Sequence, residues 1–132
     1  MDSTPEETRL RPHPAERFGK PIKLLDLPAE IRRLRAEAAP VRHGHRQIAL
    51  DRHGPVTLVL FAFEEGGSLR DHRADGVVVI HALEGNLVVR AEGEEYELRS
   101  DMAVMLAPGV PHSVEARQAS TMLLTVCLVG GE

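Results

Sequence analysis

One stretch near the start of the chain has the apolar spacing of a helix. Apolar residues recur three or four positions apart on one helix face: Ile31, Leu34 and Ala38. Asp26 and Pro28 come just before them, and both favour a helix start, since proline lacks an N–H that would be unpaired in the first turn. The pattern predicts one short amphipathic helix over about residues 28–38, closed by Pro40.

From residue 47 onward the pattern changes to short apolar and β-branched runs. These runs include Val56–Phe63, 77–80, 87–89 and 102–106. Turn-forming residues interrupt them at 64–67, 74–76, 84–86, 92–95, 108–111 and 117–120. Evenly punctuated short strands are typical of sandwiches and barrels. The sequence therefore predicts an all-β fold of about eight antiparallel strands, with a barrel core over about residues 47–129.

Several of these runs lack the alternation that marks a strand with one solvent-exposed face. Val77, Val79 and the run Val56–Phe63 offer more apolar surface than one barrel interior can hold. In a small barrel the outer face is covered either by the helix or by another subunit. We therefore expect a homodimer.

Length and composition indicate a single domain. At 132 residues the chain is long enough to close one core and too short for two. The first 20 residues contain three prolines and many charges. We therefore expect a flexible N-terminal tail over residues 1–21 and one domain over residues 22–132.

Charge and cysteine content limit the classes of partner and compartment. A net charge of -4 and a pI near 6.0 disfavour nucleic-acid binding, which needs clustered Lys and Arg in excess. Three arginines near the helix, Arg32, Arg33 and Arg35, fit a solvated helix face. No run approaches the roughly 18–20 apolar residues needed to span a bilayer, so we expect no membrane segment. The single cysteine, Cys127, lies in an apolar run, which predicts a buried thiol in a reducing cytoplasm.

Two segments carry most of the chemical information in the chain. Residues 66–85 read GGSLRDHRADGVVVIHALEG, and residues 101–116 read DMAVMLAPGVPHSVEA. They resemble the two signature motifs of the cupin superfamily, G-x5-H-x-H-x3-4-E-x6-G and G-x5-P-x-G-x2-H-x3-N. The resemblance implies a double-stranded β-helix, or jelly-roll, barrel in which three histidines and a glutamate converge on a metal ion.

Only part of that ligand set is present in this sequence. The first motif keeps His72 at its first histidine, but Ala74 and Val78 occupy the second histidine and glutamate positions. The second motif keeps Gly109 and His112. Three of its other positions differ, with Asp101, Ala107 and Ala116 in place of glycine, proline and asparagine. The resemblance therefore identifies the fold more specifically than the activity.

The resemblance assigns His72 and His112 to the pocket. Alternation along a regular strand puts His72 on the face of Arg70 and Ala74. The motif spacing implies that the two histidine faces lie across the barrel interior from each other. Two imidazoles among apolar walls predict a site for a small molecule or a weakly held divalent metal. Because the sequence lacks the carboxylate of the motif's glutamate, Zn, Ni or Cu is favoured over Fe or Mn.

Other histidines are weaker candidates for a third ligand. His81 lies three residues past the glutamate position and has the opposite strand parity, which a bulge near Gly76 would reverse. Three more histidines are expected in or beside solvated loops: His43, His45 and His53. Two further roles stay open for the pair at 43 and 45, which are weak metal binding and a position at the mouth of the pocket. His13 lies in the predicted tail and receives no role.

Nucleophilic catalysis has little support in the sequence, while metal-free acid–base chemistry stays open. Cys127 has no cationic neighbour that would activate its thiol. Ser68 and Ser113 lack the sharp turn that surrounds a nucleophilic serine. Some cupin sugar epimerases use a histidine base with a tyrosine acid. Tyr96 is the only tyrosine here, and its acidic neighbours predict a surface position.

Three functions remain open from the sequence. The leading hypothesis is a small dimeric cupin that binds a small molecule or a weakly held metal through His72 and His112. The first alternative is a metal-dependent enzyme of dioxygenase or isomerase type with an unusual third ligand. The second alternative is a structural or regulatory dimer without a ligand.

Overall fold

The predicted helix is present as α3 (Leu27–Arg35) in a computed structural model that describes residues 17–38 and 41–129. The carboxylate of Asp26 caps its first turn by accepting a hydrogen bond from the Ala29 N–H at 3.1 Å. The helix ends with its cap at Ala36, before the predicted end at residue 38. Residues 1–16 of the predicted tail and Pro40 lie outside the described residues. No helix in the described ranges is long and apolar enough to cross a membrane.

Nine strands follow in the described part of the chain. They are β1 (His45–His53), β2 (Val56–Phe63), β3 (Ser68–His72), β4 (Gly76–Glu84), β5 (Asn86–Ala91), β6 (Glu94–Arg99), β7 (Ala103–Leu106), β8 (His112–Ala116) and β9 (Ser120–Leu128). They form two antiparallel sheets, sheet A in the order β1-β2-β9-β4-β7 and sheet B in the order β3-β8-β5-β6. The all-β prediction is confirmed, and β1 begins at His45 rather than at residue 47.

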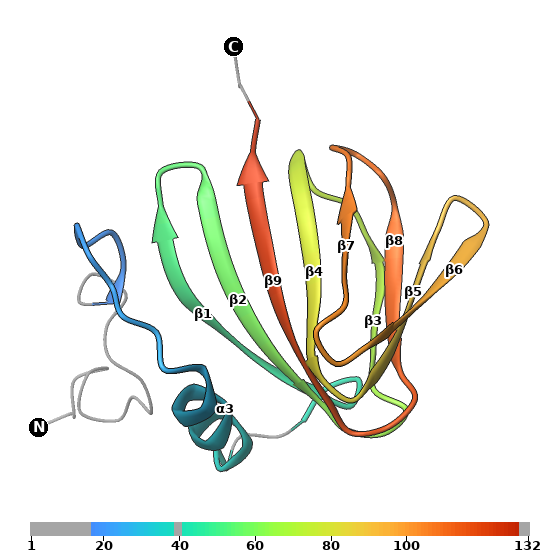
Figure 1. Ribbon diagram of the computed structural model, residues 1–132, viewed down its shortest axis with the longest axis horizontal. Helices are drawn as coiled ribbons and strands as arrows, with labels where there is room; N and C mark the ends of the chain where they lie inside the picture. Colours follow the sequence, from blue (N-terminus) through green and yellow to red (C-terminus); the bar gives the residue numbers. More distant parts are fainter. Residues whose placement is uncertain (1–16, 39–40, 130–132) are drawn as a thin grey trace, which may run out of the picture.

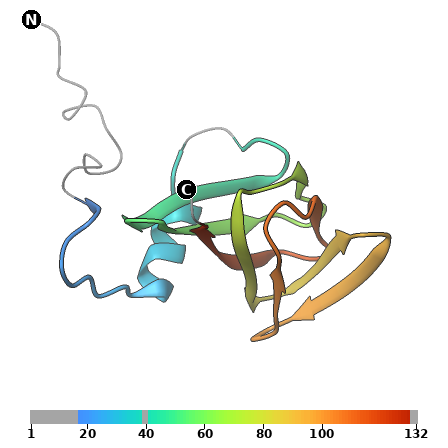
Figure 2. The same ribbon diagram turned by 90° about the horizontal axis from the view of Figure 1, so that it is seen from above.

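The chain crosses repeatedly between the two sheets. It passes from β2 in sheet A to β3 in sheet B and returns to sheet A with β4. Figure 1 shows the strands of both sheets curving toward a common narrow end, and Figure 2 shows from above how the sheets enclose one interior. Apart from the hairpins β1-β2 and β5-β6, neighbouring strands therefore come from distant parts of the sequence.

The inner faces of both sheets form one apolar core. On β4 alternate residues are buried, with Val78 at 3% and Ile80 at 0% exposed. On β5, Leu87 and Val89 are both fully buried. The other members of this inner core are Phe61, Phe63, Leu69, Ala82, Ala91, Leu98, Leu106, Val114, Ala116 and Met122. Because a slip by one residue would expose every one of these side chains, the core fixes the strand register.

Helix α3 covers part of the outer face of sheet A. Leu34 is 1% exposed and packs with Ile48 of β1 and Leu60 of β2. Figure 1 shows α3 beside β1 and β2, and its apolar cluster extends to Leu83 of β4 and Leu123 of β9. Burying a leucine in this way contributes roughly 1.5–3 kcal/mol to stability.

Beyond α3 the outer face of sheet A carries an uncovered apolar patch. Val77 and Val79 alternate with the buried residues of β4 and so point away from the inner core. Met105 of β7 lies opposite Val79 and is 69% exposed. Cys127 and Thr125 of β9 lie opposite Val77 and Val79. These five residues are called the outer patch below.

The position of Cys127 differs from the prediction of a buried core thiol. The side chain is only partly buried. On β9 the inner core takes Met122, and Leu124 and Val126 pack against that core with the same parity. Cys127 has the opposite parity and therefore lies on the outer face. The prediction is wrong because an apolar run without alternation does not reveal which of its residues face inward.

Replacing Leu34 with Ala should lower the free energy of unfolding by about 2–5 kcal/mol, because it leaves a cavity between α3 and sheet A. Urea denaturation at fixed protein concentration measures this change. Arg33→Ala is the matched control on the same helix, since its side chain is 64% exposed and its ion pair with Glu30 spans 3.5 Å. The control should change stability by less than about 0.5 kcal/mol. Equal effects would contradict the packing described for α3.

Candidate functional site

His72 and His112 lie directly opposite each other on neighbouring strands. Their Cα atoms pair where β3 meets β8, and their ring centroids are 6.4 Å apart. They share the inner face of sheet B with Val114 and Ala116. The structure thus brings the two predicted residues together. It places them side by side within one sheet, not across the barrel interior as the motif spacing implies.

A bulge in β3 puts His72 on the same sheet face as His112, although the His72 side chain stays exposed. The register with β8 shifts between Leu69 and His72, so Arg70 and Asp71 together stand opposite one residue of β8. Asp71 adopts a left-handed backbone conformation with φ of 47°. His72 therefore shares the face of Leu69. The prediction that it shares the face of Arg70 is wrong, because it assumed a regular strand.

The two ligand positions that the motif leaves empty belong to the apolar core. Val78 occupies the glutamate position and is 3% exposed in the inner core. Ala74 occupies the second histidine position and packs against the same core. Neither side chain offers a coordinating atom, so this part of the interior has apolar contacts where the family motif has ligands.

His81 does not join His72 and His112. It lies on β4 between the buried residues Ile80 and Ala82, so its side chain points to the outer face of sheet A. The pairing of β4 with β9 runs without a register shift from Gly76 to Ala82. The bulge that would have turned His81 inward is therefore absent from this stretch.

His112 is held in one tautomer by its own loop. Its side chain is 6% exposed, and Nδ1 lies 3.1 Å from the carbonyl oxygen of Val110. Since a carbonyl only accepts, Nδ1 carries the hydrogen and donates it. The lone pair of the neutral ring is then on Nε2. Backbone hydrogen bonds of this kind commonly orient histidines that bind metals.

The surroundings of His72 favour its neutral form. Partial burial, the largest cause, lowers the pKa of its imidazole below the ordinary value. Repulsion from the other imidazoles, His112 and then His45, lowers this pKa further, while Asp71 opposes the shift. These surroundings therefore favour the neutral ring of His72, which has a lone pair available for a ligand.

His45 is a third imidazole in this region, at the junction of a loop with β1, and its ring is partly buried rather than solvated. It begins β1, and its ring centroid lies 5.4 Å from that of Phe61 and from that of Phe63. Its Nδ1 lies 3.0 Å from the carbonyl oxygen of Ser68, and its Nε2 lies 3.1 Å from Oε1 of Gln47. The ring is thus fixed on the inner side of the edge strand of sheet A.

A close contact between two glycines positions His45. A Cβ on Gly44 would lie 2.6 Å from the Cα of Gly67, so the backbones meet where no side chain fits. Two hydrogen bonds of 2.8 Å flank the contact, from Glu64 N–H to Gly44 O and from Ser68 N–H to His43 O. The start of β1 is therefore fastened to the start of β3. Gly44 and the Gly66-Gly67 pair are the sequence signals that could have revealed this.

The remaining candidates stand apart from the histidine pair. The side chains of His43 and His53 are exposed, as the sequence predicts. Tyr96 on β6 is 42% exposed, in agreement with its predicted surface position. His13 lies outside the described residues.

The described residues do not fit the four-ligand metal set of the family motif. Within residues 17–38 and 41–129, no three His, Cys, Asp or Glu side chains are grouped so that they could hold an ion. An ion about 2.0–2.1 Å from each imidazole nitrogen would bring the ring centroids within roughly 6.5 Å of each other. The separation of 6.4 Å between His72 and His112 reaches this limit only with the two nitrogens on opposite sides of the ion, whereas tetrahedral ligation brings the centroids to roughly 5 Å. The two rings would have to move closer to share a tetrahedral ion.

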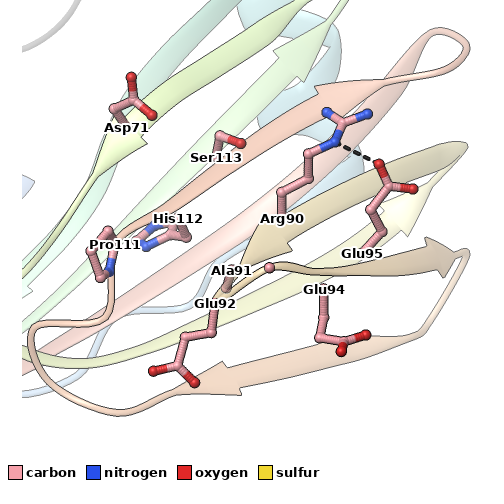
Figure 3. Close-up of a pocket in the computed structure, with 10 residues that line it drawn as sticks. Asp71, Arg90, Ala91, Glu92, Glu94, Glu95, Pro111, His112 and Ser113 are labelled. Atoms are coloured by element: carbon pink, nitrogen blue, oxygen red, sulfur yellow. Dashed lines mark hydrogen bonds and ion pairs between the residues drawn. The ribbon is translucent and has the colours of Figure 1, made fainter.

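A cleft of about 380 Å³ opens beside His112 at the end of sheet B (Figure 3). One wall is held by Arg90, which donates to Glu95 at 2.7 Å and to Glu115 at 2.9 Å. Glu92 and Glu94, at the turn between β5 and β6, lie on the other side of the hairpin in Figure 3. Because its carboxylates outnumber its one guanidinium, the cleft has a negative charge.

Comparison with known proteins identifies the family. Residues 59–128, slightly more than half of the chain, match the cupin domain family. The chain therefore belongs to the cupin family, and the matched region contains His72 and His112. No functionally curated protein matches the chain.

Solved structures similar to the chain support the same fold. A conserved protein of unknown function from Streptococcus pyogenes is 20% identical, with 85% of this chain and 92% of that chain covered and a TM-score of 0.67. A cupin superfamily protein from Desulfitobacterium hafniense DCB-2 is 20% identical, with coverages of 69% and 84% and a TM-score of 0.63. A predicted oxalate decarboxylase from Thermotoga maritima is 17% identical, with coverages of 64% and 81% and a TM-score of 0.60. These similarities confirm the predicted jelly-roll barrel. They do not identify a specific activity.

Gly44→Ala should destabilise the protein by about 2–5 kcal/mol, because the new Cβ meets the backbone of Gly67 and the backbone is left-handed, with φ of 71°. Gly93→Ala is the matched control, since Gly93 has φ of 78° but open space around its Cα. Gly93→Ala should lower the free energy of unfolding by only about 1–2 kcal/mol, the strain of placing alanine in a left-handed conformation. Urea denaturation of both variants gives the comparison. Equal losses would show that the contact with Gly67 contributes nothing.

Proposed function

We propose that the protein is a small cupin that binds a small molecule or a weakly held divalent metal through His72 and His112. The orientation of His112 carries this proposal. Its side chain is 6% exposed, its Nδ1 is taken by Val110, and its Nε2 has no hydrogen-bond partner among the described residues. A buried imidazole with an available lone pair beside a second neutral imidazole is suited to a ligand.

The donor set favours Zn, Ni or Cu over Fe or Mn. Neutral imidazoles suit the former ions, and the inner core contributes no carboxylate at the motif's glutamate position, where Val78 stands. Two protein ligands give low affinity, because tight sites commonly use three or four. For an organic ligand, His45 and Gln47 on β1 add polar contacts near the aromatic pair Phe61 and Phe63.

A metal-dependent enzyme of dioxygenase or isomerase type has weaker support. It requires a third ligand, and His81 lies on the outer face of sheet A. The similarity to the predicted oxalate decarboxylase from Thermotoga maritima concerns the fold at 17% identity. Stoichiometric metal in protein purified without a polyhistidine tag would favour the enzyme over the proposed weak site.

We also propose a homodimer located in the cytoplasm. The outer patch includes Met105 at 69% exposure and forms an apolar surface that α3 leaves uncovered, which is typical of an interaction surface. The cytoplasm is supported by the lone, partly buried thiol of Cys127, which suits a reducing compartment. Without an excess of positive charge, we propose no nucleic-acid partner.

Added Zn, Ni or Cu should raise the melting temperature of the wild type slightly, because a weakly bound ligand stabilises only in proportion to its occupancy. His72→Ala and His112→Ala should each lose this shift. His81→Ala is the control and should keep it, because His81 lies on the other face of β4. The measurement is a thermal melt of the four proteins with and without each metal.

The same experiment also tests the competing site. A shift that persists in both His72→Ala and His112→Ala would exclude these residues as the site. A large shift that disappears in His81→Ala would instead support a three-ligand site that includes His81. Wild-type protein without added metal should have the same melting temperature before and after treatment with a chelator.

Wild-type protein should be a dimer by light scattering at micromolar concentration. Met105→Glu should shift it toward monomer, because a charge would be buried in the apolar outer patch. Tyr96→Glu is the matched control, since Tyr96 is 42% exposed on β6 in the other sheet. A monomeric wild type, or equal behaviour of the two variants, would contradict the proposed interface.

A further inference from the structure

One row of residues crosses the inner face of sheet B, from the histidine pair to the acidic edge strand β6. The paired Cα positions run from His72 to His112, from His112 to Ala91 and from Ala91 to Glu94. Residues paired across neighbouring strands share a face, and Ala91 belongs to the inner core. Glu94 therefore stands on the same face as His112, two strands away.

Ala91 leaves a gap in the middle of this row. Neighbouring strands lie about 4.8 Å apart, so the Cα atoms of His112 and Glu94 are roughly 10 Å apart. Alanine has no side-chain atom beyond Cβ and leaves the space between them open. The same three residues line the cleft of about 380 Å³, as Figure 3 shows. The cleft therefore joins the imidazole to the carboxylate.

Glu94 differs from its neighbours on β6 because its carboxylate has no partner. Glu95 and Glu97 alternate to the outer face, where Glu95 accepts from Arg90 at 2.7 Å and Glu97 accepts from Asn86 at 2.7 Å. In the part of the chain that the structure describes, the Glu94 carboxylate makes no ion pair and no hydrogen bond. Its negative charge is therefore not balanced within the cleft.

His112 supplies a second acceptor to the same cleft. Its side chain is 6% exposed, and its Nδ1 donates to Val110, so the lone pair of the neutral ring is on Nε2. No described residue donates to this lone pair. Arg90 is the one guanidinium that lines the cleft, and it already donates to Glu95 and Glu115. The cleft thus presents acceptors and negative charge without a free guanidinium.

We propose that the small molecule bound at His112 is an organic cation with an ammonium N–H, held between Nε2 of His112 and the carboxylate of Glu94. This inference rests on the proposed ligand site at His72 and His112 and specifies the class of ligand. A primary ammonium group has three N–H donors and no acceptor, which complements the two acceptors.

The spacing of these groups fits an organic cation better than a metal ion. A metal ion needs its ligand atoms at about 2 Å. No three His, Cys, Asp or Glu side chains in the described ranges are grouped that closely. An ammonium group contacts its acceptors at about 2.7–2.9 Å, and its attached carbon chain occupies the space over Ala91.

An NMR titration of the imidazole nitrogens tests the class of ligand. The experiment is done at mildly alkaline pH, where an alkylamine is protonated and histidine rings are neutral. Butylammonium should give a saturable shift of the His112 Nε2 signal. Tetramethylammonium, which has no N–H, and butyrate, which has the opposite charge, should bind at least about tenfold more weakly.

Glu94→Gln tests the role of the carboxylate, because it keeps the size of the side chain and removes its charge. The dissociation constant for butylammonium should rise roughly fivefold, the effect of losing a solvent-accessible ion pair. Glu97→Gln is the matched control, since it removes the same charge from the opposite face of β6. The control should leave the dissociation constant unchanged. Equal constants for wild type and Glu94→Gln would overturn the proposal.

The other outcomes separate this inference from the proposed function. Tighter binding of butyrate or tetramethylammonium than of butylammonium would overturn the ammonium class and leave His112 in a small-molecule site. Ring signals that respond to Zn and to none of the organic probes would overturn the inference and leave the weak metal site. Signals that respond to neither would remove both the inference and the proposed site.

Discussion

The close approach of Gly44 and Gly67 fastens one sheet to the other at their edges. Two backbones without side chains meet there, and hydrogen bonds of 2.8 Å on either side hold them. Because β1 starts at this point, strand alternation sends His45 inward and Ile48 outward. The same contact therefore fixes the His45 imidazole on the inner face of β1. It also fixes Ile48 on the outer face, where Leu34 of α3 packs.

The polar part of the interior depends on one irregularity in an otherwise regular sheet. Without the bulge at Arg70 and Asp71, His72 would point away from His112. The histidine pair is consequently a property of the β3–β8 pairing and not of barrel closure as a whole. Val78 and Ala74 meanwhile join the apolar packing of the barrel interior.

Local signals in the sequence were sufficient for the architecture but not for the faces of particular strands. Asp26 and Pro28 marked the helix start, and evenly spaced turns marked the strands. The motif spacing selected His72 and His112, which pair where β3 meets β8, but a regular-strand rule gave His72 the wrong face. A bulge depends on how two strands pair, and alternation in one strand contains no information about its partner.

The position of His45 stayed open at the level of sequence for the same kind of reason. Its position depends on a contact between residues that are far apart in the chain, Gly44 and Gly67, and a lone histidine after a glycine resembles an ordinary turn. Cys127 was assigned to the core because its run is apolar throughout. Runs of this kind occur where both faces of a strand are covered, and also where one apolar face is left uncovered within the protomer. Only the fold distinguishes these two cases.

The acidic strand β6, which borders the cleft in sheet B, has a consequence for how copies of the protein associate. It is an edge strand on which only Leu98 is buried, and it displays Glu94, Glu95, Glu97 and Arg99 to solvent. A second β6 laid alongside it would bring carboxylates together at every other position, which opposes the addition of further strands. Growth of sheet B into fibrillar aggregates is therefore discouraged at this edge.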